Sequence, residues 1–499
     1  MQKRIIISAA LIILEILLLI NTVISFAGAL IWVYTAAEII SLVTVAHIVT
    51  KRGNQSYKIM WIIFIMAVPL FGVLAYMLWG GGRFWPGIKK RMKDCENKYF
   101  SELNAIDASN SLNFNDMLHF RQAAYLKNDS GFPVYSNTTS EFYGSGEAFF
   151  EALIKELQKA KKYIFIEFFI LAEGFMWEEI FKILKQKSSE GVQIKIIFDD
   201  FGSLKRQSNG FINSLKTAGI EVSVFNPIRP SMDIFMNNRN HRKIVVIDGE
   251  VAFTGGINIG DEYINKIERF GHWVDSGIML RGEAVSSFVA MFCSMWEFTA
   301  KKPLIMRDYL AEHNIINDGF YIPYCDNPLN STNPAQGIYM QIISTAQKYV
   351  YITTPYLILD NEMLSVLSLA AKSGVDIRII TPHVPDKRYV HPVTQYYYSE
   401  LLDAGVKIYE YTPGFIHSKL FVSDDSVATV GTVNMDYRSF NFHFECGVWC
   451  SGAKTINDVK ANFIEISEKS QEIDKNEWDK RSLFLRFRQS ILHLFAPLM

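Results

Sequence analysis

The stretch NHRKIVVIDG, residues 240–249, joins a strand-forming run to a cationic entrance. Its consecutive Ile and Val residues are typical of a buried β-strand. Because strand side chains alternate, we expect His241 and Lys243 on one face and Arg242 on the opposite face. A single stretch of this kind could be the basic end of a strand in solvent. Its meaning therefore depends on whether the pattern recurs.

The pattern does recur. The stretch IHSKLFVSDD, residues 416–425, has the same spacing, and in both copies an Asn follows ten residues after the Asp. Both copies read HxKx4Dx6GxxN. The repeated positions are His241, Lys243, Asp248 and Asn258 in the first copy and His417, Lys419, Asp424 and Asn434 in the second. Recurrence of so many fixed positions indicates a common function rather than chance.

The two copies also have equivalent surroundings, in which short β-rich runs alternate with helical patterns. The expected strands are 163–171 and 192–200 in the first half and 349–356 and 375–382 in the second, with helices at 177–187 and 362–372 between them. This alternation predicts an α/β fold built from two duplicated halves, residues 136–315 and 316–455. Each half is expected to be a mixed sheet flanked by helices, and the halves are expected to share one active site at their interface.

The composition argues against a nucleic-acid-binding surface and for a membrane protein. The net charge is −1 and the pI is about 6.8, whereas nucleic-acid-binding domains are usually basic. Besides His47, residues 5–50 contain only two acidic or basic side chains, those of Glu15 and Glu38. A second apolar block spans residues 60–79. We expect an anchor of two or three transmembrane helices within residues 1–85. A cleaved signal peptide is disfavoured because a second apolar block follows the first.

The cysteines suggest which compartment the catalytic part faces. The five residues are odd in number and widely scattered, which fits reduced thiols better than a disulfide framework. The distribution of Lys and Arg around the apolar blocks does not decide the orientation. We therefore expect a multi-pass protein of the cell membrane whose catalytic region faces the cytoplasm.

Two further segments flank the catalytic halves. Residues 86–135 are expected to be a linker, and residues 456–499 an amphipathic helical segment. In the latter, apolar residues recur at helical spacing with arginines among them: Leu483, Phe487, Ile491, Leu494 and Phe495, with Arg481, Arg486 and Arg488. Membrane contact and docking onto the protein core explain this pattern equally well.

The repeated residue types suit transfer of a phosphoryl group. Of two facing imidazoles, one can attack as a nucleophile while the other protonates the leaving oxygen. Two ammonium groups and two amides can surround the phosphoryl oxygens, so no metal is needed to neutralise their charge. The asparagines could instead serve turn formation. Asp248 and Asp424 could be catalytic or could only anchor the end of a strand.

The doubled motif resembles the phospholipase D superfamily, and the chain resembles the bacterial cardiolipin synthases over nearly its whole length. Besides both motifs, the similar stretches are TTPY (353–356), AGVKIY (404–409), VGTVNMDYRS (430–439) and LFAPLM (494–499). The superfamily often has Ser where this chain has Gly256 and Thr432. The resemblance implies a double displacement through a phosphohistidine, with His241 as the nucleophile and His417 as the acid.

The same resemblance implies supporting carboxylates downstream of each motif. The matching residues are Asp275 in HWVDSG and Glu445 in FHFECG, each of which would orient the histidine of the opposite half. His272 and His443 lie beside these carboxylates outside the motif, and we interpret them as packing residues or headgroup contacts.

The implied reaction transfers a phosphatidyl group from one phosphatidylglycerol to another, giving cardiolipin and glycerol without a cofactor. The alternative is a membrane-bound phospholipase D, or another phosphatidyltransferase with a different acceptor. A nuclease is disfavoured by the anchor and the neutral charge, and an inactive scaffold by the two intact motifs. The expected partners are phosphatidylglycerol and membrane lipid, not nucleic acid. The sequence predicts no oligomeric state.

Overall fold

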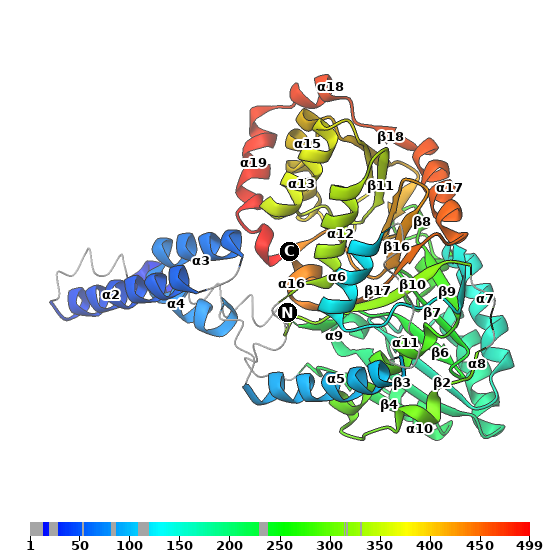
Figure 1. Ribbon diagram of the computed structural model, residues 1–499. Coiled ribbons are helices and arrows are strands. Elements are labelled where there is room, and N and C mark those ends of the chain that lie inside the picture. The colour runs from blue at the N-terminus through cyan, green and yellow to red at the C-terminus, as the bar shows by residue number, and fades with distance from the viewer. Residues whose placement is uncertain are drawn as a thin grey trace. The chain divides into compact units, whose positions relative to one another are not determined.

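Figure 1 shows the computed structural model of the 499-residue chain. The structure describes residues 13–18, 28–51, 54–80, 86–107, 119–228, 238–313, 315, 318–329 and 332–499. The chain divides into two compact units. One unit holds the described residues up to Pro86 together with Leu494–Leu498, and the other holds the remainder.

The N-terminal unit contains one described helix that is long and apolar enough to cross a membrane. This helix, α2 (Gly28–Thr50), contains a candidate span at Trp32–Thr50, and most of the span's large apolar side chains are exposed. The second apolar block is interrupted: α3 (Gln55–Ala67) ends at Val68, and α4 (Pro69–Ala75) restarts with Pro69 in its first turn before a π-helical turn, η1 (Tyr76–Gly80). Pro69 cannot donate the backbone hydrogen bond of a continuous helix. The first predicted span lies mostly in residues 1–12 and 19–27, outside the described residues.

A buried carboxylate joins the parts of this unit. Glu15 accepts hydrogen bonds from the backbone amides of Leu70 and Phe71, at 3.0 and 3.2 Å. These amides form the start of α4, whose unpaired N–H groups and dipole favour a negative charge. Trp61 and Tyr76 pack edge to face nearby, with ring centroids 5.4 Å apart. An acidic residue inside an apolar run therefore has a structural partner.

The first catalytic half is a seven-stranded sheet in the order β1-β9-β7-β6-β2-β3-β4. Only β2-β3-β4 pair in parallel, so the sheet is mixed, as predicted. The strands are β1 (Thr138–Tyr143), β2 (Tyr163–Phe168), β3 (Gln193–Asp199), β4 (Glu221–Phe225), β6 (Ile244–Ile247), β7 (Val251–Gly255) and β9 (Gly277–Gly282). The helices are α7 (Gly146–Lys159), α8 (Phe175–Ser189), α9 (Asp200–Ser203), α10 (Phe211–Thr217) and α11 (Val285–Ala300), with 3-10 turns η4 (Asp261–Ile264) and η5 (Met306–Tyr309).

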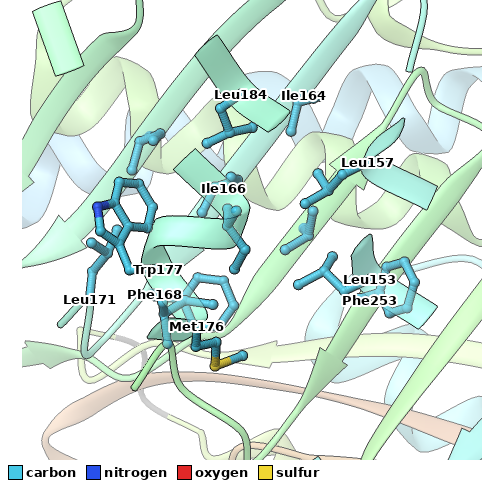
Figure 2. Close-up of a cluster of buried hydrophobic side chains, with 14 of the residues drawn as sticks. Leu153, Leu157, Ile164, Ile166, Phe168, Leu171, Met176, Trp177, Leu184 and Phe253 are labelled. Atoms are coloured by element: carbon cyan, nitrogen blue, oxygen red, sulfur yellow. The ribbon is translucent and has the colours of Figure 1, made fainter. Parts of the chain in front are cut away.

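Helices cover both faces of this sheet. Alternate residues of β2 (Ile164, Ile166 and Phe168) join a buried cluster with α7 and α8, as Figure 2 shows. The intervening Phe165 points to the other face and stacks on Phe292 of α11, with centroids 4.3 Å apart. Burial on both faces explains the continuous apolar run of this strand.

The second half repeats the arrangement in the order β10-β17-β16-β15-β11-β12-β13-β18. Its strands are β10 (Phe320–Asp326), β11 (Tyr349–Thr353), β12 (Asp376–Pro382), β13 (Lys407–Tyr411), β15 (Leu420–Ser423), β16 (Val427–Gly431), β17 (His443–Ser451) and β18 (Ser470–Glu472). Its helices are α12 (Pro334–Thr345), α13 (Asn361–Lys372), α14 (His391–Tyr396), α15 (Tyr398–Ala404), α16 (Tyr437–Asn441), α17 (Thr455–Glu468), α18 (Lys475–Asp479) and α19 (Leu483–His493), followed by the 3-10 turn η6 (Ala496–Leu498). The duplicated α/β fold is thus confirmed.

The segment predicted as a linker contains two helices that pack on the catalytic halves. Glu96 of α5 (Pro86–Asp107) accepts a hydrogen bond from Asn327 at 2.7 Å. Gln122 of α6 (Phe120–Ser130) accepts one from the indole of Trp449 at 2.9 Å. These buried contacts make the segment part of the catalytic unit, and they depend on tertiary partners that local sequence patterns do not reveal.

Each half donates a short strand to the other. The two-residue strand β5 (Arg239–Asn240) precedes His241 and pairs in parallel with β17 of the second half. Reciprocally, β14 (Gly414–Ile416) precedes His417 and pairs in parallel with β8 (His272–Val274) of the first half. The entrance of each motif is therefore hydrogen-bonded to the half that carries the other motif.

At the far end of each motif strand, an Asp caps the neighbouring strand. Asp248 accepts hydrogen bonds from the backbone amides of Lys161, Lys162 and Tyr163, at 2.7 to 2.8 Å. Asp424 binds the equivalent amides of residues 347–349, at 2.6 to 2.9 Å. Both aspartates have positive φ, 55° and 53°, in the turns that end β6 and β15. These contacts with the amides at the strand ends fit the anchoring role that the sequence left open.

We expect Asp248→Asn and Asp424→Asn to reduce stability rather than turnover. Replacing an ionised acceptor of three amides should lower the free energy of unfolding by about 1–3 kcal/mol. Thermal denaturation in detergent measures this effect, and kcat corrected for the folded fraction should change little.

Asp425→Asn is the matched control for this prediction. It follows Asp424 in the same turn, and its half-exposed carboxylate pairs with Lys460 and accepts from the hydroxyl of Tyr349 at 2.9 Å. An Asn oxygen can still accept from that hydroxyl, so the substitution should cost about 0.5 kcal/mol or less. A large fall in kcat in well-folded Asp248→Asn would contradict the anchoring role.

Candidate active site

His241 is held by the opposite half through both its backbone and its ring. Its amide donates to the carbonyl of Phe444 at 2.9 Å, which continues the pairing of β5 with β17. Its Nδ1 lies 2.9 Å from both carboxylate oxygens of Glu445 on the same strand. Because Nδ1 is occupied, Nε2 is the ring nitrogen available for chemistry.

His417 repeats this arrangement with the halves exchanged. Its amide donates to the carbonyl of Val274 at 2.7 Å, and its Nδ1 lies 2.7 Å from Oδ2 of Asp275. The structure therefore brings together each motif histidine and the carboxylate of the opposite half. Both histidines and both carboxylates are buried.

The two lysines lie beside their histidines and are almost fully buried. The ammonium of Lys243 donates to the carbonyl of His241 at 2.7 Å, and that of Lys419 donates to the carbonyl of His417. Burial is the main cause that lowers the pKa of Lys243 to about 8 and that of Lys419 to about 7. The charge of Lys243 lowers the pKa of Lys419 further, so the two cations act on one another.

Burial and the same cations lower the pKa of both histidines. Burial and then Lys243 lower the pKa of His241 well below its ordinary range, and the charges of Lys419 and His417 add to this effect. Burial and then Lys419 lower the pKa of His417 to about 4, although Asp275 partly opposes them. This mutual influence across the halves indicates one shared electrostatic environment.

The pKa values of the two acids behind the histidines shift in opposite directions. Burial raises the pKa of Glu445 well above its ordinary range. Burial also acts to raise the pKa of Asp275, but the charge and hydrogen bond of His417 outweigh it and the pKa is lowered. Asp275 is therefore the ionised partner, which makes His417 the imidazole better supported as a cation.

The two motif asparagines have local protein partners. Oδ1 of Asn258 accepts from the amide of Ile170 at 3.0 Å, and its Nδ2 donates to the hydroxyl of Tyr263 at 2.8 Å. Nδ2 of Asn434 donates to Ser439 at 3.1 Å. Both side chains are buried. These bonds fix the two amides, and a phosphate-binding role for them stays a prediction.

The two departures from the superfamily pattern act on the two carboxylates. A Cβ on Gly256 would lie 2.0 Å from Oδ1 of Asp275, so glycine leaves the space that this carboxylate occupies. In the other half, the hydroxyl of Thr432 donates to Glu445. Gly256 thus makes room for Asp275, and Thr432 binds Glu445.

Arg242 faces away from the lysines, as strand alternation predicts. It is fully buried, its Nε donates to the carbonyl of Glu445 at 3.3 Å, and its Nη2 lies 4.0 Å from Glu96 of α5. Glu167 of β2 accepts from Asn240 at 2.8 Å, and burial raises the pKa of this acid to about 7. These contacts of Arg242 and Glu167 were not predicted from the sequence, in which the only signal was an arginine between the two motif cations.

His443 lies closer to the chemistry than a packing residue would. Its ring centroid is 5.4 Å from that of His241, and its Nδ1 is 3.5 Å from Oε1 of Glu445. Among the described residues, His241, His443 and Glu445 form one group whose ligand atoms lie within 4.8 Å of one another, as a metal site requires. The adjacent Lys243 ammonium disfavours a cation there, and Glu445 already uses the Nδ1 of His241. We derive no metal step from this group.

The comparisons agree with this geometry. The family model described as "Cardiolipin synthase, PLD-like domain" matches residues 153–296 and 339–467, and one described as "Phospholipase_D-nuclease N-terminal" matches 39–81. The crystal structure of phosphatidylserine synthase from Haemophilus influenzae superposes with a TM-score of 0.59 at 15% identity. This superposition covers 75% of this chain and 97% of the other, and it shows a common fold. The fold and the double motif define a phospholipase D-like phosphatidyltransferase.

Similar bacterial proteins show which family of phosphatidyltransferases the chain belongs to. Cardiolipin synthase 2 of Bacillus cereus is 36% identical over 90% of this chain and 88% of its own length. An uncharacterized protein of Streptococcus mutans is 41% identical over 91% of this chain and 99% of its own length. The chain belongs to the cardiolipin synthase family.

We expect Thr432→Val to reduce kcat by about tenfold, because it removes a hydrogen bond worth about 1.5 kcal/mol from the carboxyl group that orients His241. Thr432→Ser keeps the hydroxyl and should retain most of the activity. Turnover of the purified variants measures both effects. Equal losses in the two variants would show that side-chain packing at residue 432 matters rather than its hydroxyl group.

Proposed function

We propose that the protein joins two phosphatidylglycerol molecules to give cardiolipin and glycerol through a phosphohistidine on His241. The main support is the pair of crossed histidine–carboxylate contacts, which leave two Nε2 atoms for reaction within one electrostatic environment. Lys243 and Lys419 would neutralise the phosphoryl oxygens in the transition state. No cofactor or metal takes part in the proposed reaction.

In the first step, Nε2 of neutral His241 attacks phosphorus and the bond to the headgroup glycerol breaks. His417 gives its Nε2 proton to the departing oxygen, so glycerol leaves as a neutral molecule. We assign the role of acid to His417 rather than His241 because the ionised Asp275 supports a positive charge on His417. The negative charge of the bound phosphodiester would further favour protonation of His417.

In the second step, the neutral His417 removes the proton from the hydroxyl of a second phosphatidylglycerol. That oxygen attacks phosphorus, the phosphorus–nitrogen bond breaks, and His241 is restored. The exchange converts one phosphodiester into another, and the proton returns to His417 for the next cycle.

A second group of cations favours an anionic lipid as the acceptor. Burial and then the charges of Arg438, Lys243 and Lys387 lower the pKa of His443 well below its ordinary range. Arg438 and Lys387 are not motif residues, and their charges act on the side of the site that holds His443. They could bind the phosphate of the acceptor lipid. A water-using phospholipase D is the alternative, and its acceptor requires no such charge.

The membrane location is part of the proposal. We infer a multi-pass anchor that includes α2 and the interrupted α3–α4 pair, with the catalytic region facing the cytoplasm. The apolar exposed surface of α2 supports the anchor. All five cysteines are free and buried, in keeping with a reducing compartment.

The assigned order predicts different behaviour for the two histidine variants. With a p-nitrophenyl phosphodiester lipid, whose leaving group needs no proton, His417→Ala should release p-nitrophenol once and retain an acid-labile phosphatidyl adduct on His241. His241→Ala should release none and form no adduct. Mass spectrometry of the active-site peptides, with EDTA in all assays, measures the adduct. An adduct on His417 in the wild type would reverse the order, and dependence on a divalent ion would contradict the metal-free reaction.

The lysines predict the alkaline limb of the pH profile. Each ammonium is charged below its pKa, so raising the pH through about 7 to 8 removes the charge that binds phosphate. We expect kcat/KM, which reports the free enzyme, to fall across this interval. A bound phosphodiester should raise both pKa values, so kcat should fall only at higher pH. Identical alkaline limbs for kcat and kcat/KM would contradict this assignment.

A further inference from the structure

Helix α19 packs on the protein through a polar residue. Gln489 is 2% exposed, its Oε1 accepts from Arg481 at 3.1 Å, and its Nε2 donates to Gln395 at 3.5 Å. At the end of the helix, His493 stacks on Tyr396, with ring centroids 4.0 Å apart. Figure 1 shows α19 in red near the C-terminal end of the chain. A helix of a water-soluble protein normally buries its apolar face instead.

The opposite face of α19 is apolar and exposed. The exposed fractions are 80% for Leu483, 78% for Phe484 and 64% for Phe487, and Ile491 is exposed as well. With about 100° of rotation per residue, these four side chains fall within an arc of about 100° centred opposite Gln489. The helix therefore presents a compact stripe of large apolar side chains away from its protein contacts. Four such residues in one stripe are more than the scattered surface apolar residues of a soluble protein.

Cations border this stripe on both sides. By the same rotation, Arg486 lies on one flank and Arg488 on the other, and both are exposed. An apolar stripe flanked by arginines matches a helix that lies in the plane of an anionic bilayer. There the apolar side chains enter the acyl region while the guanidinium groups reach the phosphates.

The chain beyond α19 leads into the N-terminal unit. The helix ends at His493, and the following residues, Leu494–Leu498, belong to the unit that contains α2. Within that unit, η6 contacts α3. The residues that directly follow the exposed apolar helix therefore belong to the same unit as the candidate membrane span.

We propose that α19 is an interfacial membrane helix that binds the surface of an anionic phospholipid bilayer. Leu483, Phe484, Phe487 and Ile491 would lie among the acyl chains, with Arg486 and Arg488 on the lipid phosphates. Because α19 packs on α14, it would hold that side of the catalytic unit at the lipid surface. The chain enters α14 through the loop that contains Lys387, the residue proposed to meet the acceptor lipid. The inference goes beyond the proposed reaction, and its test requires no turnover.

The test places a fluorescent label on the apolar stripe. All five native cysteines are buried, so Phe487→Cys in the full-length protein can be labelled with an environment-sensitive nitrobenzoxadiazole group. The protein is reconstituted into nanodiscs of phosphatidylglycerol and phosphatidylethanolamine that contain doxyl-labelled lipid. Asp458→Cys on α17, which is also exposed, is the matched control. Phe484→Cys provides a second position if the first variant folds poorly.

We expect blue-shifted emission and strong doxyl quenching at residue 487, and neither at residue 458. Arg486→Glu combined with Arg488→Glu should weaken the quenching severalfold in these nanodiscs and change it little in phosphatidylcholine nanodiscs. An unquenched, water-exposed label at residue 487 would overturn the proposal. So would a label with blue-shifted emission that doxyl-labelled lipid does not quench, which would mean that the same chain or a second copy covers the stripe. Inactive protein with a quenched label would contradict only the proposed reaction.

Discussion

The architecture of the site depends on a reciprocal exchange of backbone hydrogen bonds between the halves. Strand β5 leaves the first half and pairs with β17, which carries Glu445. Strand β14 leaves the second half and pairs with β8, which leads to Asp275. The amides of His241 and His417 continue this pairing, so the backbone positions each ring before any side-chain contact forms. The carboxylates then select the tautomer. Neither half alone contains a motif histidine together with the acid that its Nδ1 contacts.

Burial of several cations in one place is the electrostatic cost of this arrangement. The two lysines and two histidines lower one another's pKa values, which keeps the histidines neutral and leaves the lysines close to titration near neutral pH. An empty site is thus destabilised by like charges, and an incoming phosphodiester relieves that repulsion. The opposite pKa shifts of Asp275 and Glu445 break the symmetry of the duplicated halves. Duplication supplied two equivalent histidines, and their different acidic partners, Glu445 and Asp275, make them unequal.

The sequence predicted the elements with a strong local pattern and missed the contacts that only the fold creates. The alternating runs around β2 and β11, and the duplication itself, follow from hydrophobic periodicity and motif spacing. Pro69 was a visible sign that the second apolar block is not one helix. By contrast, β5 has only two residues, too short for any periodicity, and its partner is about two hundred residues away. The pairing of Glu445 with His241 was available only through family resemblance.

The same limit applies to the expected linker and to His443. Residues 86–135 were expected to be a linker, yet Glu96 and Gln122 within them are buried against the catalytic halves. His443 was interpreted as a packing residue or a headgroup contact, and its Nδ1 lies 3.5 Å from the carboxyl group that also holds His241. Glu96 and Gln122, by contrast, have hydrogen-bond partners more than two hundred residues away. Sequence spacing alone cannot show whether such a partner exists.

The carboxylate of Glu15 has a consequence for how the chain enters a bilayer. Its partners, the first amides of α4, lie 55 and 56 residues further along the chain. During synthesis the acidic residue emerges well before the amides that donate hydrogen bonds to it, and an unpartnered carboxyl group is costly in hydrocarbon. In the proposed membrane location, the segment around Glu15 therefore cannot settle stably until α4 has been made. The anchor must assemble as one packed group of helices rather than one helix at a time.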